Sequence, residues 1–428
     1  MALLQHATVA AAKKILSKLR LILKSAQSMI VAFTIPAMGH VKPMLPLLSG
    51  LVGNGQEIVC FGHTAFESAI RSSGARFLPY PGFAYDIDAP DFNLLRMGAD
   101  LLRASRTFHA QLSADVVALS PRLILQDSMA FWASRIGTAL DIPRIHTIPT
   151  LVFNPATQRR MRKEDGYAKL AADVFRGAPA LLREMARFGF AVSLQEVFGV
   201  ERSWRRLAPP RCELVFSLKE LQVGDPWGDV PRHYIGPTID EGRRFEPRAG
   251  RGYALITFGT LSNNDTRRFE AAIEGAFLAG LSVVALCGRK VDLPRLESVA
   301  KALEAANPGQ EATVLDTVRD MEPLIAGADV VIHHAGMATT WEMVRYSKPA
   351  LFIPTIADQK VLASQLDAQG LGIRLPPGRE LDPHAIARAL EALKDRDYPW
   401  GRIRDLLARA GGAPAGVGIV MEALGTGR

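Results

Sequence analysis

The 428-residue sequence lacks the features of several common protein classes. No apolar run reaches the roughly 18 to 20 residues that a membrane-spanning helix needs. Cysteine is scarce, and Cys60, Cys212 and Cys287 lie far apart without a CxxC spacing. This argues against a zinc site or a disulfide framework, and it favours a reducing compartment. We therefore expect a globular protein of the cytoplasm, long enough for two domains.

Two binding motifs are also missing. The first apolar strand is not followed by G-x-G-x-x-G, and no acidic residue stands at the usual ribose position, which disfavours a dinucleotide oxidoreductase. The formal net charge of +8 has no nucleic-acid-binding motif beside it. We expect a solvated basic surface and no nucleic-acid partner. Asp86-Ile-Asp88 resembles a metal-binding DxD motif, but we interpret it as a solvated loop and predict no metal site.

Residues 1–28 contain no acidic residue and place basic side chains among apolar ones, as in a basic amphipathic helix: Lys13, Lys14, Lys18, Arg20 and Lys24. Such a helix can lie on an anionic membrane surface, which would make the protein peripheral to the membrane. It also resembles a transit peptide. A third interpretation is an extension upstream of the true start, since Met29 opens the first strand directly. The sequence leaves all three open.

Strand-like and helix-like segments alternate from Met29 onward, which predicts parallel sheets covered by helices on both faces. The strands expected in the first half are 30–35, 57–61, 76–78, 122–126, 144–148 and 213–217. A helix is expected at 43–52, because proline suits the first helical turn and Gly53-Asn-Gly55 ends the pattern. Residues 155–208 are helix-prone and either build a substrate pocket or serve as plain structural helices.

A polar stretch at 238–251, after His233-Tyr-Ile-Gly-Pro237, predicts a linker. The strands expected beyond it are 254–258, 281–286, 312–315, 330–334 and 350–353. We divide the chain into the extension 1–28, a first domain 29–236, a second domain 237–400, and C-terminal helices 401–428 that pack back toward the first domain. Two doubly wound Rossmann-like domains would face a cleft, and ligands bind such sheets beyond the carboxyl ends of the strands.

The segment from Val331 to Glu342 is the most informative. An apolar strand ends at His334, and a turn with Gly336 leads to a helix that we expect to begin near Thr339. Unpaired N–H groups at a helix start can hold a diphosphate without a lysine. Gly336 lets a phosphate approach the backbone, His334 can donate a hydrogen bond to it, and Thr339 can add a hydroxyl. The same four residues from Thr339 to Glu342 also fit a capping box with no ligand.

A second polar group follows the next strand. Lys348-Pro-Ala-Leu-Phe-Ile-Pro354 is strand-like, and Ala357-Asp358-Gln359 follows at its carboxyl end. Asp358 and Gln359 should therefore face the same crevice as the Gly336 turn. A carboxylate beside an amide suits sugar hydroxyls, which need both acceptors and donors.

A histidine and a carboxylate are predicted in the first half. His40 comes after the first strand and before the first helix, and Asp127 ends the strand from Leu123. Both should emerge at the same edge of one sheet. A neutral imidazole can remove a hydroxyl proton near pH 7, and a carboxylate on its far nitrogen would fix its tautomer. We predict His40 as general base and Asp127 as its partner.

At this point the sequence resembles the family 1 glycosyltransferases, especially the bacterial macrolide glycosyltransferase type, from Met29 to nearly the C-terminus. The resemblance depends most on the C-terminal stretches His334–Glu342, Pro349–Pro354, Ala357–Gln359 and Gln369–Pro377. The N-terminal match is Ala37-Met-Gly-His-Val-Lys-Pro-Met-Leu-Pro46, and shorter matches are Asp127–Trp132, Tyr234–Pro237 and Thr257–Thr260.

The resemblance implies a GT-B architecture and an inverting, metal-independent hexose transfer from a UDP- or dTDP-sugar, with no other cofactor. It implies roles for donor-binding residues: the diphosphate would be held by Gly259, Thr260, His334 and Thr339, the ribose by Glu342, and the donor sugar by Asp358 and Gln359. We count Gly336 and Thr340 among the donor-binding residues as well. It also maps the family's catalytic dyad onto His40 and Asp127. The partners would be a nucleotide-sugar and a small, largely apolar, hydroxylated acceptor of the natural-product type.

The sequence departs from the family pattern at two places. Ala338 replaces the Asn that often precedes the phosphate-binding Ser or Thr, and Val318-Arg-Asp320 replaces the usual base-stacking Val-Pro-Gln segment. Nucleobase choice therefore stays open. Two other functions also stay open: a membrane-associated enzyme that glycosylates a lipid or sterol, and a catalytically inactive homologue that serves as a partner subunit. The presence of both His40 and Asp127 argues against the inactive homologue.

Overall fold

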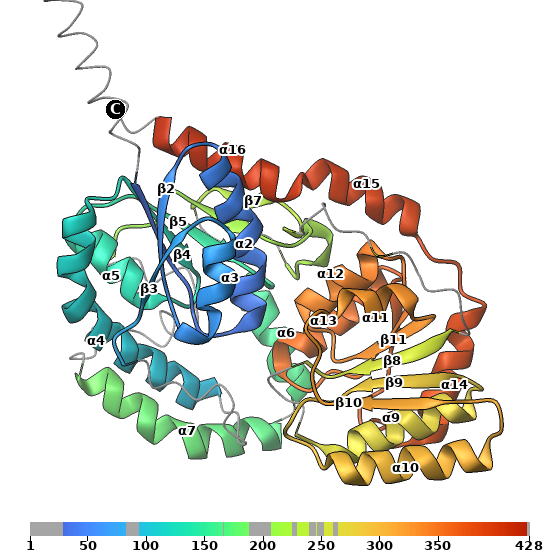
Figure 1. Cartoon of the computed structure of the whole chain (residues 1–428). Coiled ribbons are helices and arrows are strands. Elements are labelled where there is room, and N and C mark those ends of the chain that lie inside the picture. The colour runs from blue at the N-terminus through green and yellow to red at the C-terminus, as the bar shows by residue number, and fades with distance from the viewer. Residues whose placement is uncertain are drawn as a thin grey trace, which may run out of the picture.

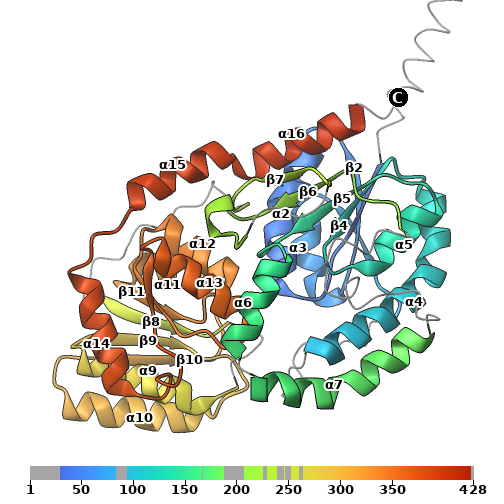
Figure 2. The ribbon, with the colours of Figure 1, turned by 180° about the vertical axis from the view of Figure 1, so that it is seen from behind.

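The computed structural model describes residues 29–82, 94–165, 167–187, 207–224, 229–238, 245, 252–259 and 264–425. Within them the chain forms two α/β halves, each built on a parallel sheet with helices packed against it (Figure 1). The view from behind shows the same two halves, with the C-terminal helices running from one to the other (Figure 2). This confirms the predicted α/β fold with two doubly wound sheets.

The first sheet has the strand order β3-β2-β1-β4-β5-β6-β7, and all its neighbouring strands are parallel. Its strands are β1 (Met29–Phe33), β2 (Glu57–Gly62), β3 (Arg76–Pro79), β4 (Leu123–Asp127), β5 (Arg144–Ile148), β6 (Cys212–Val215) and β7 (Arg232–Tyr234). Alternate β1 side chains enter two different apolar cores: Ile30 and Ala32 lie in one, Val31 and Phe33 in the other. Burial on both faces explains why β1 is a continuous apolar run.

The first-half helices are α2 (Met38–Gly53), α3 (Glu67–Ser72) after the short η1 (Thr64–Phe66), α4 (Leu94–Leu119), α5 (Phe131–Ala139), α6 (Pro155–Asp165) and α7 (Tyr167–Arg187), and η3 (Lys219–Leu221) follows β6. In the 155–208 region, α7 packs on α4, whereas α6 packs on α13 (Ala357–Ala368) of the other half. Glu164 of α6 forms a two-bond ion pair with Arg374, at 2.6 and 3.1 Å. So α6 is one of the contacts that join the halves.

The prediction of a first helix at 43–52 was wrong at its start. Helix α2 begins at Met38, with Ala37 as its N-cap, and it contains both Pro43 and Pro46. An interior proline removes a backbone hydrogen bond, which costs about 3 kcal/mol. The helix persists because one face is fully buried in the core: Val41, Met44, Leu47, Leu48 and Leu51. His40 consequently lies within the first turn of this helix and not before it.

The second sheet has the order β10-β9-β8-β11-β12-β13, again all parallel. Its strands are β8 (Tyr253–Thr257), β9 (Ser282–Leu286), β10 (Ala312–Leu315), β11 (Val330–His333), β12 (Ala350–Phe352) and β13 (Gly372–Arg374). The helices are α9 (Thr266–Leu278), α10 (Leu293–Ala306), α11 (Glu322–Gly327), α12 (Met337–Arg345), α13 and α14 (Pro383–Lys394). Two apolar cores again lie on opposite faces of the sheet.

Two short strands were not predicted. The segment that opens the expected linker is in part an edge strand, β7, because Glu213 of the neighbouring β6 pairs with Arg232 both along the backbone and by an ion pair at 2.6 Å. At the other edge, β13 has only three residues, too few for a periodic pattern. The remainder of the expected linker, apart from residues 238, 245 and 252 onward, lies outside the described residues.

The C-terminal helices return to the first half. Helix α15 (Trp400–Ala410) buries Ile403 and Leu406 in a core shared with the second half, and α16 (Gly412–Gly425) packs on α2. Val417, Val420 and Leu424 of α16 belong to the core beneath the first sheet. Figures 1 and 2 show this path along the outside of the molecule. Helix α16 therefore completes the apolar core of the first half.

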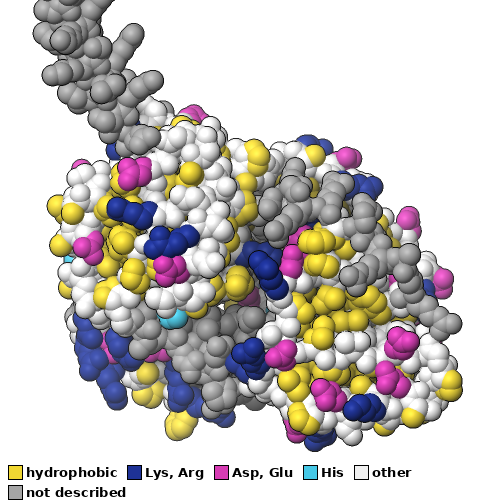
Figure 3. All heavy atoms as spheres, in the orientation of Figure 1, with side chains coloured by type: hydrophobic (Ala, Val, Ile, Leu, Met, Phe, Trp, Pro, Cys, Tyr) yellow, Lys and Arg dark blue, Asp and Glu magenta, His cyan; other side chains and the backbone are white. Residues whose placement is uncertain are grey.

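Basic side chains gather over α4 and α7 in the space-filling view (Figure 3). Arg103 and Arg106 of α4 and Arg187 of α7 surround the buried carboxylate of Glu184 at 2.7 to 3.7 Å. Part of the positive surface thus has a structural role in joining α4 to α7. No helix in the described ranges has the length and apolar character to span a membrane. The predicted amphipathic segment 1–28 lies outside these ranges.

Candidate active site

His40 and Asp127 meet at the carboxyl edge of the first sheet. Helix α2 follows β1, and Asp127 is the last residue of β4, which is the neighbour of β1. His40 Nδ1 lies 2.8 Å from Asp127 Oδ2, and the two side chains are 15% and 2% exposed. The other carboxylate oxygen accepts a hydrogen bond of 2.9 Å from the backbone N–H of Met129. The sequence prediction that these residues emerge together is thus matched by their geometry.

This arrangement sets the chemistry of the imidazole. A carboxylate accepts hydrogen bonds and does not donate them, so the proton of neutral His40 belongs on Nδ1, facing Asp127. Nε2 then carries the lone pair and is the atom that can take up a proton. The burial of Asp127 and its bond from Met129 hold the carboxylate in place, and the carboxylate would stabilise the imidazolium after proton uptake.

The predicted anion cradle lies at the carboxyl edge of the second sheet, where β11 leads into α12. The strand ends at His333 and the helix begins at Met337, with Gly336 as its N-cap, so the helix starts two residues earlier than expected. Ala335, between them, has a φ of 61°, a left-handed conformation that is unfavourable for a residue with a side chain. The strained residue is therefore Ala335, and Gly336 has an ordinary φ of −69°.

Glycine at 336 is required by a different contact. A Cβ at Gly336 would lie 2.4 Å from Nε2 of His334, and a Cβ at Gly259 would lie 2.4 Å from Cε1 of the same ring. Gly259 also has a φ of +69°. The imidazole of His334 is thus sandwiched between two backbone turns, one after β8 and one after β11. Both turns, and the start of α12, face the same edge of the sheet.

Burial and a nearby cation hold His334 neutral. Burial lowers its pKa to about 4, and the positive charge of Arg268 acts in the same direction. Its Nδ1 has no hydrogen-bond partner among the described residues. The guanidinium of Arg268 lies 5.8 Å from the Phe258 ring centroid, and its side chain is 18% exposed. A neutral imidazole beside an arginine and a helix start has the hydrogen-bonding and charge properties for an anion.

The capping box, the alternative interpretation of Thr339 to Glu342, is absent from α12. The N-cap is Gly336, so Thr339 lies in the middle of the first turn, and the Thr340 hydroxyl donates to the Gly336 carbonyl at 2.9 Å. Glu342 is buried and accepts a hydrogen bond from Lys42 of α2, in the other half. The box fails because the helix begins earlier than the pattern indicated, which moves the Glu342 carboxylate away from the helix start. This ion pair also brings α2 and α12 together.

Asp358 and Gln359 lie in the first turn of α13, after β12. β12 is the neighbour of β11, so this helix start lies at the same edge as that of α12. The side-chain oxygen of Gln359 accepts hydrogen bonds from the Thr355 backbone at 3.1 Å, from the Thr355 hydroxyl at 2.7 Å and from Ile356 N at 3.3 Å. Part of Gln359 therefore stabilises the start of α13, a role that the sequence analysis missed. Asp358 is half-buried.

Two predicted features cannot be placed, and two charged residues near the site were not predicted. Thr260, predicted to bind the diphosphate, lies outside the described residues, as does Asp86-Ile-Asp88. Lys42 and Arg268 belong to the two facing edges and were not predicted. Arg268 has no sequence signal. Lys42 stands two positions after His40, within the stretch that resembles the family, but its partner is 300 positions away and no local pattern could reveal it.

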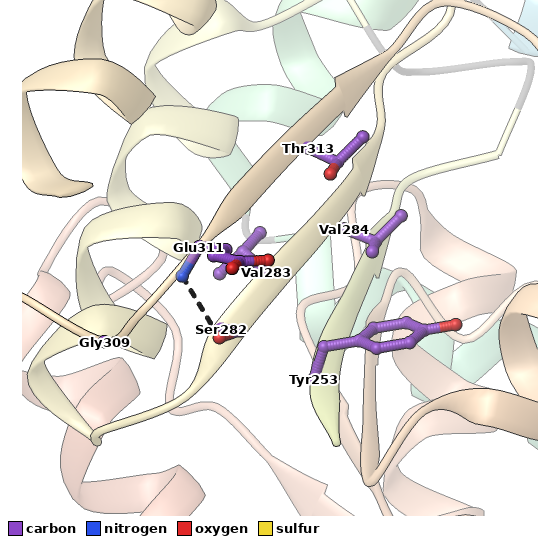
Figure 4. A pocket seen from close by; sticks show the side chains of 7 residues that line it. All are labelled: Tyr253, Ser282, Val283, Val284, Gly309, Glu311 and Thr313. Atoms are coloured by element: carbon purple, nitrogen blue, oxygen red, sulfur yellow. Dashed lines mark hydrogen bonds between the residues drawn. The ribbon is translucent and has the colours of Figure 1, made fainter. Parts of the chain in front are cut away.

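A hollow of about 380 Å³ lies elsewhere and is not a donor site (Figure 4). Its lining includes Tyr253, Ser282 and Glu311, and the Glu311 backbone N–H donates to the Ser282 hydroxyl at 3.1 Å. These residues lie at the amino ends of β8, β9 and β10. Ligands of open parallel sheets bind at the opposite, carboxyl ends. Among the described residues, Gly259, the turn from His334 to Gly336, and Asp358 with Gln359 follow the carboxyl ends of β8, β11 and β12.

Comparisons with known proteins show what the chain is similar to. The family described as "Glycosyltransferase family 28 C-terminal domain" matches residues 260–398. The chain is 25% identical to an NDP-glycosyltransferase, YjiC, of Bacillus subtilis, over 90% of this chain and 94% of that protein. It is 24% identical to the demethyllactenocin mycarosyltransferase of Streptomyces fradiae, over 92% of this chain and 86% of the relative.

Two solved structures share the fold. The glycotransferase of kitacinnamycin has a TM-score of 0.74 and 22% identity, and the match covers 93% of this chain and 99% of that one. The spinosyn rhamnosyltransferase SpnG complexed with thymidine diphosphate has a TM-score of 0.61 and 16% identity, and the match covers 92% and 100%. These three comparisons agree with one another: the relatives, the matched C-terminal domain and the shared two-sheet fold all point to a glycosyltransferase. The chain is a glycosyltransferase with the GT-B fold, and it is similar along its length to glycosyltransferases that include macrolide glycosyltransferases.

Proposed function

We propose that the chain transfers a hexose from a UDP- or dTDP-sugar to a hydroxyl group of a small, largely apolar acceptor, with inversion at the anomeric carbon. The observation that supports this most directly is the bond between His40 and Asp127, on a helix that contacts α12 of the second half. The first half would supply a proton acceptor, His40, and the second half an anion-binding site at the start of α12. The choice of diphosphate donor draws on the relatives, which include an NDP-glycosyltransferase and a protein solved with thymidine diphosphate.

In the proposed reaction the acceptor oxygen attacks the anomeric carbon as its proton passes to His40 Nε2. The bond between that carbon and the diphosphate oxygen breaks, and the nucleoside diphosphate leaves with the electron pair. A single displacement of this kind inverts the anomeric centre. Asp127 stabilises the imidazolium, and the N–H groups at the start of α12 stabilise the negative charge on the leaving group.

The positions of the other predicted residues suggest how each would bind the nucleotide-sugar. His334, Gly336 and Gly259 form the turn pair that would hold the diphosphate, with Thr339 and Thr340 in the adjoining turn of α12. Glu342 would accept hydrogen bonds from the ribose hydroxyls. Asp358 and Gln359, at the neighbouring helix start, would bind the donor sugar. We propose that neither a metal ion nor a further cofactor is needed, because helix N–H groups, histidine and basic side chains can together balance a diphosphate.

The acceptor would bind on the first-half side of the cleft, where α4 to α7 are packed. Two relatives are named for demethyllactenocin and oleandomycin, which supports a natural-product acceptor, and others are named for zeaxanthin and for a sterol. A lipid or sterol acceptor is the alternative, and membrane contact through residues 1–28 belongs to it. Parallel assays with a macrolide panel and with sterol-containing vesicles, for the full chain and for a chain without residues 1–28, distinguish the two.

The test of the proposed function is a panel of UDP- and dTDP-hexoses with hydroxylated acceptors, in the presence of EDTA, followed by mass spectrometry. A product heavier than the acceptor by one hexose residue supports the proposal, and NMR of the anomeric proton gives the stereochemistry. No transfer from any donor, in EDTA or with added divalent metal, would overturn it. Transfer only with metal would overturn its metal-independent form.

A further inference from the structure

One ion pair connects the two halves of the fold. Lys42, in the second turn of α2, donates a hydrogen bond to Glu342 of α12, although the residues are 300 positions apart. The Lys42 side chain is 45% exposed, whereas that of Glu342 is 5% exposed. Lys and Arg side chains are visible where the two halves meet in the space-filling view (Figure 3). The ammonium thus reaches a buried carboxylate from the accessible side.

The surroundings of Glu342 are strongly acidic. Burial raises the pKa of Glu342, the ion pair with Lys42 lowers it, and the negative charges of Glu322 and Asp320 raise it further. Glu322 has its own partner, Arg345, at 3.3 Å. Glu342 Oε2 has no hydrogen-bond partner among the described residues. Lys42 is therefore the cation that balances this buried carboxylate, and one of its oxygens is still open to a hydrogen-bond donor.

Donor binding changes what these two groups can do, if the chain binds a nucleotide-sugar as proposed above. Ribose hydroxyls are neutral donors and can take the place of an ammonium at Glu342. The displaced ammonium keeps its charge, and its helix holds it in the cleft. Glu342 lies six residues after the N-cap Gly336, which is about 9 Å along α12. The diphosphate would lie between the start of α12 and Glu342, within reach of the Lys42 side chain from α2.

We propose that Lys42 is a donor-binding residue that the first half supplies to the second. Without the donor it is paired with Glu342, and with the donor bound it pairs with an anionic oxygen of the diphosphate. Its charge offsets the repulsion that the carboxylates of Glu342, Glu322 and Asp320 would exert on a diphosphate. It stands two residues after His40 on the same helix, so binding of the donor at Lys42 also brings the general base toward the anomeric carbon.

The test compares nucleoside diphosphates with the corresponding nucleosides, so that the diphosphate part of binding is isolated. Calorimetry measures the Kd of UDP and dTDP, and ligand-observed NMR at millimolar concentration measures uridine and thymidine. For Lys42→Met we expect the diphosphate Kd to rise at least tenfold, since a charge-assisted hydrogen bond is lost. The nucleoside Kd should stay the same or fall, because the ribose no longer competes with an ammonium. The salt dependence of diphosphate binding should also become weaker.

Two variants control the experiment. Lys42→Arg keeps the charge and should recover part of the affinity for the diphosphate, and Lys301→Met removes an exposed lysine of α10 and should leave every Kd unchanged. An equal loss for nucleoside and diphosphate in Lys42→Met, or no loss for either, would overturn the proposal for Lys42 alone. Failure of the wild-type chain to bind either diphosphate would instead overturn the proposed function, and this proposal with it.

Discussion

His40 and Asp127 are 87 positions apart, yet His40 Nδ1 and Asp127 Oδ2 lie 2.8 Å apart. The pairing arises from sheet order, since β4 crosses over to lie beside β1 and delivers its last residue to the helix that follows β1. The carboxylate is almost fully buried and has a second bond from Met129, so it cannot turn away without losing a hydrogen bond. The pair is therefore built for orientation of the ring.

The first prediction concerns this pair. His40→Ala should lower kcat by a factor on the order of 10² to 10⁴, the usual contribution of a general base, with the Kd for the nucleoside diphosphate unchanged. Asp127→Asn should lower kcat in the same range, because an amide cannot stabilise the imidazolium. His384→Ala, on the exposed face of α14, is the matched control. The measurements are steady-state transfer by mass spectrometry and calorimetry of UDP or dTDP. Transfer near the wild-type rate in His40→Ala would contradict the assignment of His40 as the general base.

The second prediction isolates the close approach of His334 to the backbone. Gly336→Ala adds a Cβ that would meet the ring at 2.4 Å without any backbone strain, since φ is −69°. We expect a loss of stability of about 1–3 kcal/mol from overpacking, and at least a tenfold rise in the nucleoside diphosphate Kd as the ring is displaced. Gly401→Ala, in α15, meets no atom within 4 Å and is the control. Unchanged nucleotide affinity in Gly336→Ala would show that the ring position does not matter for the donor.

A third prediction concerns pH. Burial lowers the pKa of His334 to about 4 and that of His146 to about 3, and burial also lowers the pKa of His333 well below its usual value. Between about pH 6.5 and 4 the unfolded chain therefore takes up protons that these rings, when folded, do not. The free energy of unfolding should fall as the pH falls through this window, with each ring contributing up to about 1.4 kcal/mol per pH unit.

His333→Leu tests this assignment. Both ring nitrogens of His333 lack hydrogen-bond partners among the described residues, and the ring packs on Phe352 with centroids 5.2 Å apart. We expect urea unfolding at pH 7, 6 and 5 to show a slope with pH that is shallower by about one proton than in the wild type, and a variant at least as stable at pH 5. Parallel stability curves for the two proteins would mean that His333 does not contribute.

The fourth prediction concerns the C-terminal helix. Val420 of α16 is fully buried in the core of the first half. Val420→Ala should lower the free energy of unfolding by about 2 kcal/mol, from lost burial and the cavity that remains, without a change in nucleotide Kd. Val117→Ala, at a side chain that is 56% exposed, should change stability by less than about 0.5 kcal/mol. A loss of nucleotide affinity in Val420→Ala would instead indicate that α16 shapes the donor site.

Much of this architecture is predictable from local patterns. Strand positions were predicted well, and β5 and β10 begin and end at the predicted residues. The carboxyl-end rule correctly placed His40 and Asp127 at one edge of the sheet. Helix starts were less predictable, because α2 contains two prolines that local rules place at a helix start or exclude from a helix interior. Burial of one face of α2 outweighs that local preference.

Contacts between distant segments could not be predicted in the same way. The capping box at Thr339 was a reasonable local interpretation, but Glu342 forms its bond with Lys42 of the other half. Gln359, predicted to bind sugar, also accepts bonds from Thr355 and Ile356, a use of the side chain that depends on where α13 begins. Short edge strands such as β13 carry too few residues for any periodicity. Each of these features depends on a relationship across the fold and not on a neighbouring residue.

The route of the C-terminal helices has a mechanical consequence. The chain crosses from one half to the other twice, once between Tyr234 and Tyr253 and once at Gly411 and Gly412, between α15 and α16. Gly412 N donates to Ile235 O at 2.7 Å, so the two crossings lie side by side and join the halves at one place. Lengthening either crossing would let the two catalytic edges lose their alignment.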